Sequence, residues 1–377
     1  MTPEHSSPAG GATVIDLFAG CGGGSMGFAE GGIRPVAAVE LDPCAAWSYA
    51  KNVGILPIVH DISAVGETTV LDAAGLRRGE CLLLFGCPPC QSFTILRRGA
   101  VARPIDVQRN RLPREYLRLV DGILPRHIAF ENVPGMIEPR WRPHFESLMN
   151  DLAALGYSCD WDVVDAAEFG IPQHRRRLLV IGSRVAKPRL PSPTHGNEDA
   201  RIPFSTVRQA IGDLPPLLSG ERAPQDPYHR ARRHSALALR RLRAIPEGGA
   251  RKDLPPELEL NCHKRHNGHY DIYGRMWWDR PAPTLTAGCT NITRGRFAHP
   301  EQDRAITLRE AMRLQSFPDK TILAGTDDGM ALQIGNAVPP MLARRIGLCI
   351  LAMEESAQFT RERSASANRS RIDEAIR

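Results

Sequence analysis

The sequence has no apolar run of about 18 residues, which is the length that a membrane-spanning helix needs. Its first residues, MTPEHSSPAGGA, lack the charged-then-apolar pattern of a secretory signal peptide. The nine cysteines are an odd number without regular spacing, which argues against a disulfide framework and for a reducing compartment. These absences predict a cytoplasmic globular protein with no membrane partner.

The charge balance says little about function. The net charge of +6 and the pI of about 8.9 mildly favour a polyanionic partner. A slightly arginine-rich surface would explain them equally well. With 377 residues, of which 42% are hydrophobic, the chain can build one large domain or two.

Short apolar runs alternate with helical patterns up to about residue 182. The runs ATVIDLFAG, PVAAVELD, CLLLFG and RHIAFENV are typical of buried strands, and CDWDVVDA and RRLLVIGS could form a strand pair. This alternation predicts an α/β fold with a largely parallel sheet. Beyond residue 184, Pro, Gly, Arg, His and aromatic residues become frequent. We therefore predict a first domain over residues 1–184, completed by 320–355, a loop-rich second domain over 185–319, and a disordered tail over 356–377.

A glycine-rich turn, DLFAGCGGGSMGF, follows the first predicted strand, and Glu40 ends the next one. An acid at that distance can bind ribose hydroxyls. The turn departs from the phosphate-binding G-x-G-x-x-G pattern, because Asp16 and Phe18 stand just ahead of Gly20, and this favours a cationic or hydroxyl-bearing ligand. The end of the third predicted strand adds two residues to a candidate nucleoside site, Asp61 and Ile62.

The stretch LLLFGCPPCQSFT places Cys87 and Cys90 three positions apart after a strand. A redox pair would need a thioredoxin-like unit, which the surroundings do not offer. A zinc site would need two more ligands at suitable spacing. The nearest cluster of metal-ligating residue types has no C-x-x-C partner and consists of Cys262, His263, His266 and His269. The pattern favours Cys90 as a nucleophile on an exposed turn, and no metal site is expected.

A cysteine nucleophile needs acidic and basic partners. The motif ENVPGM places Glu131 at the end of a strand, where parallel-sheet enzymes present catalytic groups, although a surface or capping acid is the alternative. A partly desolvated glutamate can donate a proton to a ring nitrogen. The motif QHRRRLLVIG places Arg175 and Arg177 on one face of a strand, as an anion site or simply an exposed basic face.

Taken together and in this order, eight segments resemble the motif series of the C5-cytosine-specific DNA methyltransferases, of the bacterial restriction-modification or solitary type. They are DLFAGCGGGSMGF, VELD, HDI, GCPPCQSF, ENVPGM, QHRRRLLVIG, LREAMRLQSFPD and QIGNAVPP. Eight ordered segments are far more specific than any one of them. The resemblance implies a Rossmann-like S-adenosylmethionine-dependent methyltransferase domain and a smaller, loop-rich target-recognition domain. It also implies methyl transfer to C5 of a flipped cytosine in a specific double-stranded DNA sequence.

The same resemblance implies roles for single residues. Cys90 would add to C6 of the cytosine, Glu131 would bind or protonate N3 with support from Asn132, and Arg175 and Arg177 would hold the nucleotide and the active-site loop. S-adenosylmethionine would lie against Asp16, Phe18, Gly20, Glu40, Asp61, Ile62, Pro88 and Asn336. Cys87 stands where the family more often has a small residue, which leaves open an unusual sensitivity to oxidation.

The candidate DNA contacts follow from the resemblance as well. The loop after Cys90 would close over DNA, and arginines of the second domain would reach bases or phosphates. These candidates are Gln91, Ser92, Arg265, Arg275 and Arg294. A restriction endonuclease acting on the same site is a second possible partner.

Three rival functions are open. The same chemistry could act on RNA, as in the tRNA-methylating branch of the family, or the chain could be an inactive DNA-binding protein. A dinucleotide oxidoreductase would use the glycine turn but leaves the PPCQ and ENV motifs unexplained. Amino-group DNA methyltransferases carry an Asp/Asn-Pro-Pro-aromatic turn, where this chain has Pro-Pro-Cys.

Overall fold

The computed structural model describes residues 11–89, 111–197, 201–260 and 270–376. Within them, the N-terminal half is built on one sheet of seven strands in the order β3-β2-β1-β4-β5-β7-β6. The strands are β1 Thr13–Leu17, β2 Arg34–Glu40, β3 Ile58–Val59, β4 Leu83–Gly86, β5 His127–Asn132, β6 Ser158–Asp165 and β7 Arg176–Ser183. Strands β1 to β5 are parallel, and β7 runs antiparallel to both β5 and β6. The predicted α/β fold with a largely parallel sheet is confirmed.

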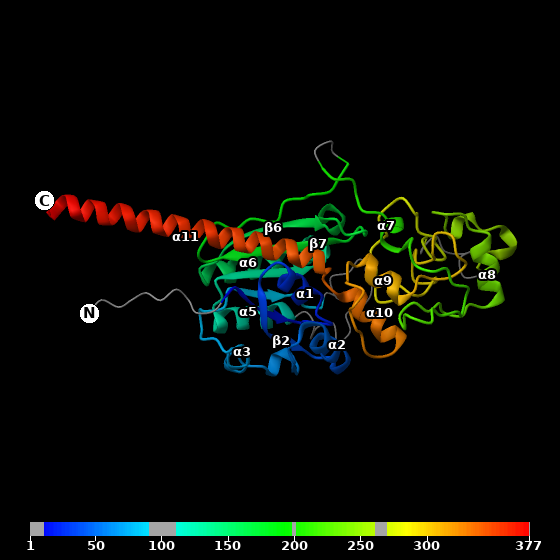
Figure 1. Ribbon diagram of the computed structural model, residues 1–377, viewed down its shortest axis with the longest axis horizontal. Helices are drawn as coiled ribbons and strands as arrows, with labels where there is room; N and C mark the ends of the chain where they lie inside the picture. The colour runs from blue at the N-terminus through cyan, green and yellow to red at the C-terminus, as the bar shows by residue number, and fades with distance from the viewer. Residues whose placement is uncertain (1–10, 90–110, 198–200, 261–269, 377) are drawn as a thin grey trace.

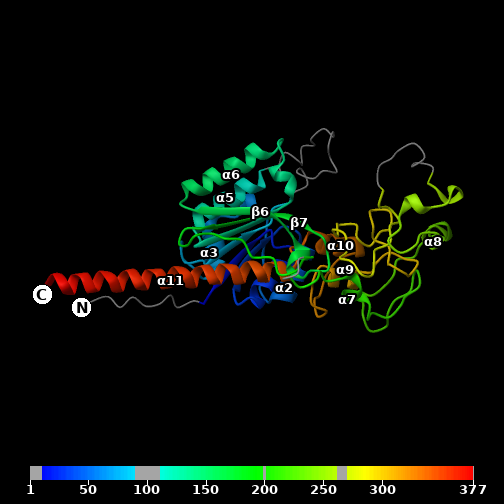
Figure 2. The same cartoon turned by 90° about the horizontal axis from the view of Figure 1, so that it is seen from above.

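Helices cover both faces of this sheet (Figures 1 and 2). One face carries α3 Glu67–Ala74, α5 Leu112–Ile123 and α6 Arg142–Ala154, and the other carries α1 Gly23–Glu30 and the start of α11 Pro340–Ile376. Helix α2 Pro43–Val53 packs beside β2. Two covered faces explain why β1 is buried along its whole length: Ile15 and Leu17 pack toward α5, and Val14 packs toward α1 and α11.

Helices α1 and α11 approach each other closely because α1 carries glycine at the contact. A Cβ atom at Gly27 would overlap the carbonyl oxygen of Pro340, and one at Gly23 would lie 2.5 Å from the carbonyl oxygen of Val338. Two glycines of the glycine-rich segment therefore serve helix packing. Helix α11, from the C-terminal part of the chain, thus completes the helical layer that covers this face of the sheet beside β1.

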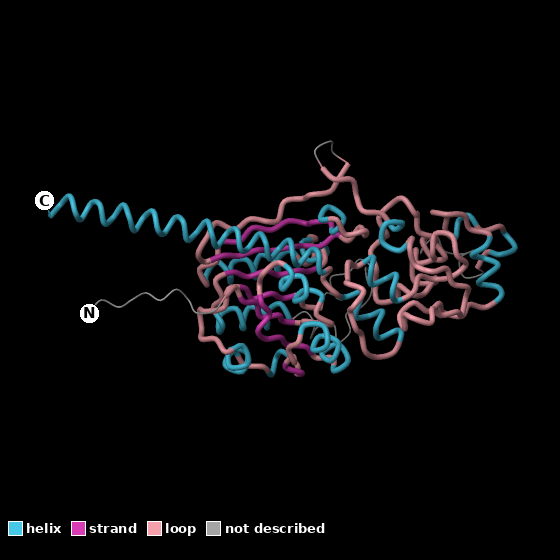
Figure 3. Tube along the Cα trace, viewed as in Figure 1, coloured by secondary structure: helices cyan, strands magenta, loops and turns pink. Residues whose placement is uncertain are grey.

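The described residues between 204 and 319 form a loop-rich lobe beside the sheet (Figure 3), whereas Ala186 and Leu190, just after β7, still pack against the core of the sheet domain. The lobe contains the short helices α7 Val207–Ile211, α8 Ala236–Arg243 and α9 Leu308–Leu314. Helix α10 Asp327–Asn336 packs against α9, so the hydrophobic core of the lobe extends into the segment after it.

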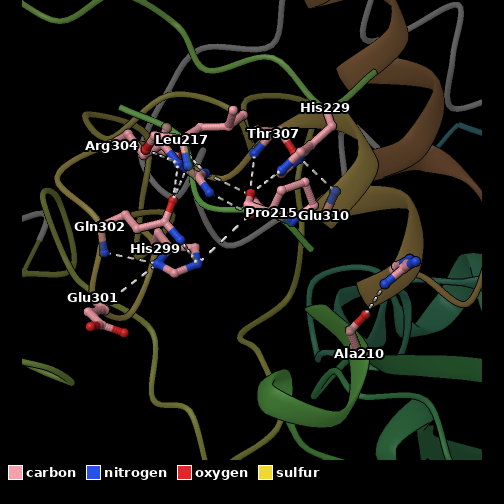
Figure 4. Close-up of polar contacts among 12 residues, drawn as sticks. Ala210, Pro215, Leu217, His229, His299, Glu301, Gln302, Arg304, Thr307 and Glu310 are labelled. Atoms are coloured by element: carbon pink, nitrogen blue, oxygen red, sulfur yellow. Dashed lines mark hydrogen bonds and ion pairs between the residues drawn. The ribbon is translucent and has the colours of Figure 1, made fainter. Parts of the chain in front are cut away.

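A network of buried polar side chains connects the loops of the lobe, where regular backbone pairing is sparse (Figure 4). The guanidinium of Arg304 donates to both oxygens of Glu310, at 2.8 and 2.7 Å. Thr307 caps α9 by accepting a hydrogen bond from the backbone N–H of Glu310. His299 lies beside this pair, and its Nδ1 accepts hydrogen bonds from the backbone N–H groups of Glu301 and Gln302. Burial lowers the pKa of His299 to about 4 and keeps the imidazole neutral.

Helix α11 differs from the prediction of a disordered tail over residues 356–377. It runs unbroken to Ile376, and its far part extends away from the rest of the protein (Figures 1 and 2). The packed first half nucleates the helix, and elongation then costs little where neither Gly nor Pro interrupts the chain. Among the described helices, none is long and apolar enough to cross a bilayer.

Candidate active site

The carboxyl ends of four parallel strands meet at one edge of the sheet. The register pairs Leu17 of β1 with Val39 of β2 and with Gly86 of β4, and Gly86 in turn with Phe130 of β5. The order of the strands reverses between β1 and β4, and open α/β sheets bind their ligands outside such a point. The glycine-rich turn, Glu40, the turn that begins at Cys87 and the ENV motif are therefore brought together.

Glu131 is the buried carboxyl group of this edge. Its side chain is 3% exposed, and its Oε1 lies 3.0 Å from Nε of Arg177 on β7. Its Oε2 accepts a hydrogen bond at 2.9 Å from the thiol of Cys87, the first residue after β4. Three segments of the chain thus place a cation and a thiol on the two oxygens of one carboxyl group. These two contacts hold the carboxyl group at a defined position on this edge of the sheet.

Asn132 ties the end of β5 to the turn after β4. Its side-chain amide donates to the carbonyl oxygen of Pro88 at 3.4 Å and accepts from the N–H of Val133 at 2.8 Å. The ring of Pro88 is buried. The predicted residues Cys90, Gln91 and Ser92 lie just beyond this turn, outside the described residues.

Arg175 does not share the position of Arg177, and the prediction of a paired arginine face is corrected here. Its guanidinium is buried and donates to the carbonyl oxygens of Leu285, Gly335 and Ala337, at 3.1, 3.0 and 3.2 Å. Alternate residues share a face only inside a strand, and β7 begins at Arg176, one residue later. Arg175 therefore joins the sheet to the C-terminal half of the chain.

Glu40 binds the backbone of the glycine-rich turn. Its Oε2 accepts a hydrogen bond from the N–H of Gly20 at 2.7 Å, and its Oε1 accepts one from the N–H of Asp42 at 2.8 Å. Phe18 adopts a left-handed conformation with φ of 60°, which is rare for a residue with a side chain, and its ring is half-buried. A Cβ atom at Gly20 would meet nothing within 4 Å. The turn thus presents backbone and ring to open space.

Two further predicted residues are exposed near this edge. Asp61 accepts hydrogen bonds from the backbone N–H and the hydroxyl of Ser63, which lower the pKa of its carboxyl group. Asn336 is exposed at the end of α10. In contrast, the side chain of Ile62 is buried in the core below β1.

Asp16 lies under the turn and not in it, so its prediction as a ligand contact is corrected. The carboxyl group is 1% exposed and accepts a hydrogen bond at 2.6 Å from Ser25, whose hydroxyl also meets that of Tyr49 at 2.7 Å. Burial raises the pKa of Asp16 to about 7. It is a strand residue whose side chain points toward α1, and there it links β1 to α1 and α2.

Comparison with known proteins identifies the chain. Residues 12–352 match the family model for C-5 cytosine-specific DNA methylases. The chain belongs to this family. It is a DNA cytosine-5-methyltransferase, and its similarity to Type II methylases connects it with bacterial restriction-modification.

Relatives of this methyltransferase match it over most of their length. The chain is 36% identical to the Type II methylase M.HgiDII of Herpetosiphon aurantiacus, covering 89% of this chain and 94% of that protein. It is 32% identical to the Type II methyltransferase M1.HphI of Haemophilus parahaemolyticus, covering 90% and 87%. A prophage-encoded methyltransferase from E. coli shares the fold with a TM-score of 0.68 at 23% identity, covering 91% of this chain and 99% of that one.

The DNA contacts predicted for the methyltransferase divide into three groups. Arg275 is 3% exposed and donates to the carbonyl oxygens of Ile245, Leu242, His299 and Gln302, so its assignment as a DNA contact is corrected. A guanidinium carries five N–H donors and can satisfy the carbonyl groups of loops that have no ladder partner. Arg294 is exposed. Arg265 lies outside the described residues.

Two polar contacts of the methyltransferase were not predicted from the sequence. The contact of Cys87 with Glu131 is the first. The second is a hydrogen-bonded pair of buried glutamines, Gln173 and Gln315. Gln173 donates to the carbonyl oxygen of Leu314 and bonds Gln315, which in turn donates to Ala337 at 2.9 Å. The signal for it was present, because both glutamines stand inside the motifs QHRRRLLVIG and LREAMRLQSFPD.

Proposed function

We propose that this methyltransferase transfers the methyl group of S-adenosylmethionine to C5 of a flipped cytosine, within a specific sequence of double-stranded DNA, through a covalent adduct of Cys90 at C6. The observation that carries the proposal is the buried carboxyl group of Glu131, with Arg177 at 3.0 Å and the turn that leads to Cys90 beside it. Flipping is required because the two ring carbons cannot be reached inside the base stack.

The residues divide the chemistry among them. The thiolate of Cys90 adds to C6 while Glu131 supplies a proton at N3, so that the electron pair is delivered to C5. Arg177 fixes the Glu131 carboxyl group, and Asn132 fixes the turn before Cys90. After C5 has accepted the methyl group, loss of the C5 proton and expulsion of Cys90 as a thiolate restore the 5,6 double bond, and the proton at N3 returns to the carboxylate of Glu131.

The open turn fits a nucleoside cofactor with hydroxyl and amino groups. Glu40 and Asp61 offer carboxylate acceptors, Phe18 offers a ring face, and Asn336 offers an amide. The space beside Gly20 admits a ligand close to the backbone. S-adenosylmethionine bound there would supply an electrophilic methyl group on a sulfonium.

Residues 185–319 would act as the target-recognition domain. Arg294 is exposed on this lobe and would contact DNA. Arg265, which lies outside the described residues, would contact DNA as well. The Type II names of the relatives support a partner restriction endonuclease that cuts the sequence this enzyme protects.

Bisulfite sequencing tests the proposal. Plasmid DNA from cells that express the chain is compared with DNA from cells that express the Cys90→Ala variant at the same level. We expect protected cytosines within one short sequence, absent with the variant, because the adduct at C6 cannot form. Protection that survives in the variant would exclude Cys90 as the nucleophile. If folded wild-type protein protects no cytosines in the plasmid, we would propose RNA as the substrate in place of DNA.

A further inference from the structure

The thiol of Cys87 lies beside the proposed catalytic groups but has no role in the proposed methyl transfer. It is half-buried, follows β4 directly, and lies 2.9 Å from Oε2 of Glu131. The backbone N–H of Cys87 continues the ladder toward the carbonyl oxygen of Leu17 at 3.5 Å. The position of the thiol is therefore set by the sheet.

We propose that Cys87 is a positioning residue, which orients the carboxyl group of Glu131 for its work on the cytosine. The inference rests on the proposed function, in which Glu131 acts at N3. The terminal torsion of a glutamate is soft, so a single contact leaves the carboxyl plane free to rotate. Arg177 holds Oε1 from β7, and Cys87 holds Oε2 from the end of β4. Contacts on both oxygens, from opposite neighbours of β5, fix the plane.

A thiol suits this role because it is a weak hydrogen-bond donor. It can define the direction of the carboxyl group and still allow that group to exchange a proton with the substrate. A lysine or arginine at the same place would bind the carboxylate far more strongly.

The alternative is that Cys87 is only a small packing residue, because it also touches the core cluster formed by Phe85, Leu342 and their neighbours. The two roles predict opposite orders among substitutions. Packing alone favours Ala and Val over Ser, since a hydroxyl buried against an apolar cluster is costly. Positioning favours Ser, which retains a donor, over Ala and Val, which have none.

The experiment measures single-turnover methyl transfer from labelled S-adenosylmethionine to unmethylated plasmid DNA that contains the protected sequence. The proteins are the wild type, Cys87→Ser, Cys87→Ala, Cys87→Val and Glu131→Gln. We expect Cys87→Ala and Cys87→Val to lower the maximal single-turnover rate about tenfold or more, as misplaced catalytic groups do, with the half-saturating concentrations of DNA and cofactor within about twofold of the wild type. Cys87→Ser should recover most of the rate.

A double variant separates positioning from stability. In the Glu131→Gln background, Cys87→Ala should cost nothing further, because it acts through the carboxyl group that has been removed. Ala or Val as active as Ser, or an equal loss in both backgrounds, would overturn the positioning role. Full activity of Glu131→Gln would instead overturn the proposed role of Glu131. If the Cys87→Ala variant does not fold, the Cys87→Val variant, whose side chain fills the space of the thiol but has no donor, is compared with Cys87→Ser in its place.

Discussion

Arginine side chains in this protein have two separate uses, and the residue type alone does not tell them apart. Arg175, Arg275 and Arg304 are almost fully buried and bind backbone carbonyl groups or a carboxylate. Arg294 is exposed. The number of arginines in the chain therefore overstates how many of them can meet DNA.

Replacing Arg275 by Met should destabilise the fold. The change removes one donor from four backbone carbonyl groups and from Asp303, and it leaves the buried carbonyl oxygens of Ile245 and His299 without the guanidinium that binds them. We expect the free energy of unfolding to fall by about 3 kcal/mol. Urea unfolding measures it. The exposed Arg294→Met is the control and should stay within about 0.5 kcal/mol of the wild type while weakening DNA binding. Unchanged stability of Arg275→Met together with weaker DNA binding would restore Arg275 as a DNA contact.

At the level of elements, the contact of α1 with α11 closes the sheet domain. Helix α11 is also fixed by Glu354, whose carboxylate accepts hydrogen bonds from Arg126 and contacts the buried His127 at 2.6 Å. Burial alone would raise the pKa of Glu354, but the hydrogen bonds from His127 and Arg126 outweigh it and lower the pKa to about 2. The start of α11 thus depends on close glycine packing, and its middle depends on an ion pair.

Gly27→Ala should weaken this contact. Alanine is favoured over glycine in an isolated helix by about 1 kcal/mol, but here the new methyl group would overlap Pro340 and push α11 from the sheet. We expect a net loss of about 1–3 kcal/mol in thermal or urea unfolding. The matched change Gly66→Ser adds a side chain where nothing lies within 4 Å, at the N-cap of α3, and should be neutral or stabilising. A stabilised Gly27→Ala would contradict the described packing.

At the level of the whole molecule, stability depends on a loop-rich lobe that buries a polar network beside its hydrophobic clusters. Arg304, Glu310 and the neutral His299 lie together there with little regular backbone pairing around them (Figure 4). The groups are costly to bury and stabilise the lobe only while each keeps its partners. The lobe should therefore be the part of the protein most sensitive to acid.

Acid should destabilise the protein through His299. Its folded pKa of about 4 lies below the ordinary histidine value of 6.5, so the unfolded chain binds the proton first and stability falls as the pH drops from 6.5 to 4. The full effect is about 3 kcal/mol. Asp16, with its pKa raised to about 7, acts in the opposite direction over much of the same range. The measurement is therefore the difference in urea stability between wild type and His299→Gln at several pH values. A difference that does not change with pH would exclude this role.

The order of motifs, the buried strands and the position of Glu131 followed from local patterns. Apolar runs that end in polar residues predict parallel strands, and parallel strands bring their carboxyl ends to one edge whatever the remainder of the chain does. Glu131 and Glu40 were therefore found from the sequence, and the structure places both at that edge. The glycine-rich turn was found in the same way.

Partners that come from distant segments could not be found in this way. The carbonyl groups that bind Arg175 stand 110 to 162 residues away, and the contact that requires Gly27 is made by the last helix. The burial of Asp16, the use of Arg275 inside the lobe and the thiol of Cys87 beside Glu131 have the same origin. Local pattern sets which residues form a strand or a turn, because those forces act between neighbours. What a side chain touches depends on which segments pack over it, and the folded chain alone establishes that.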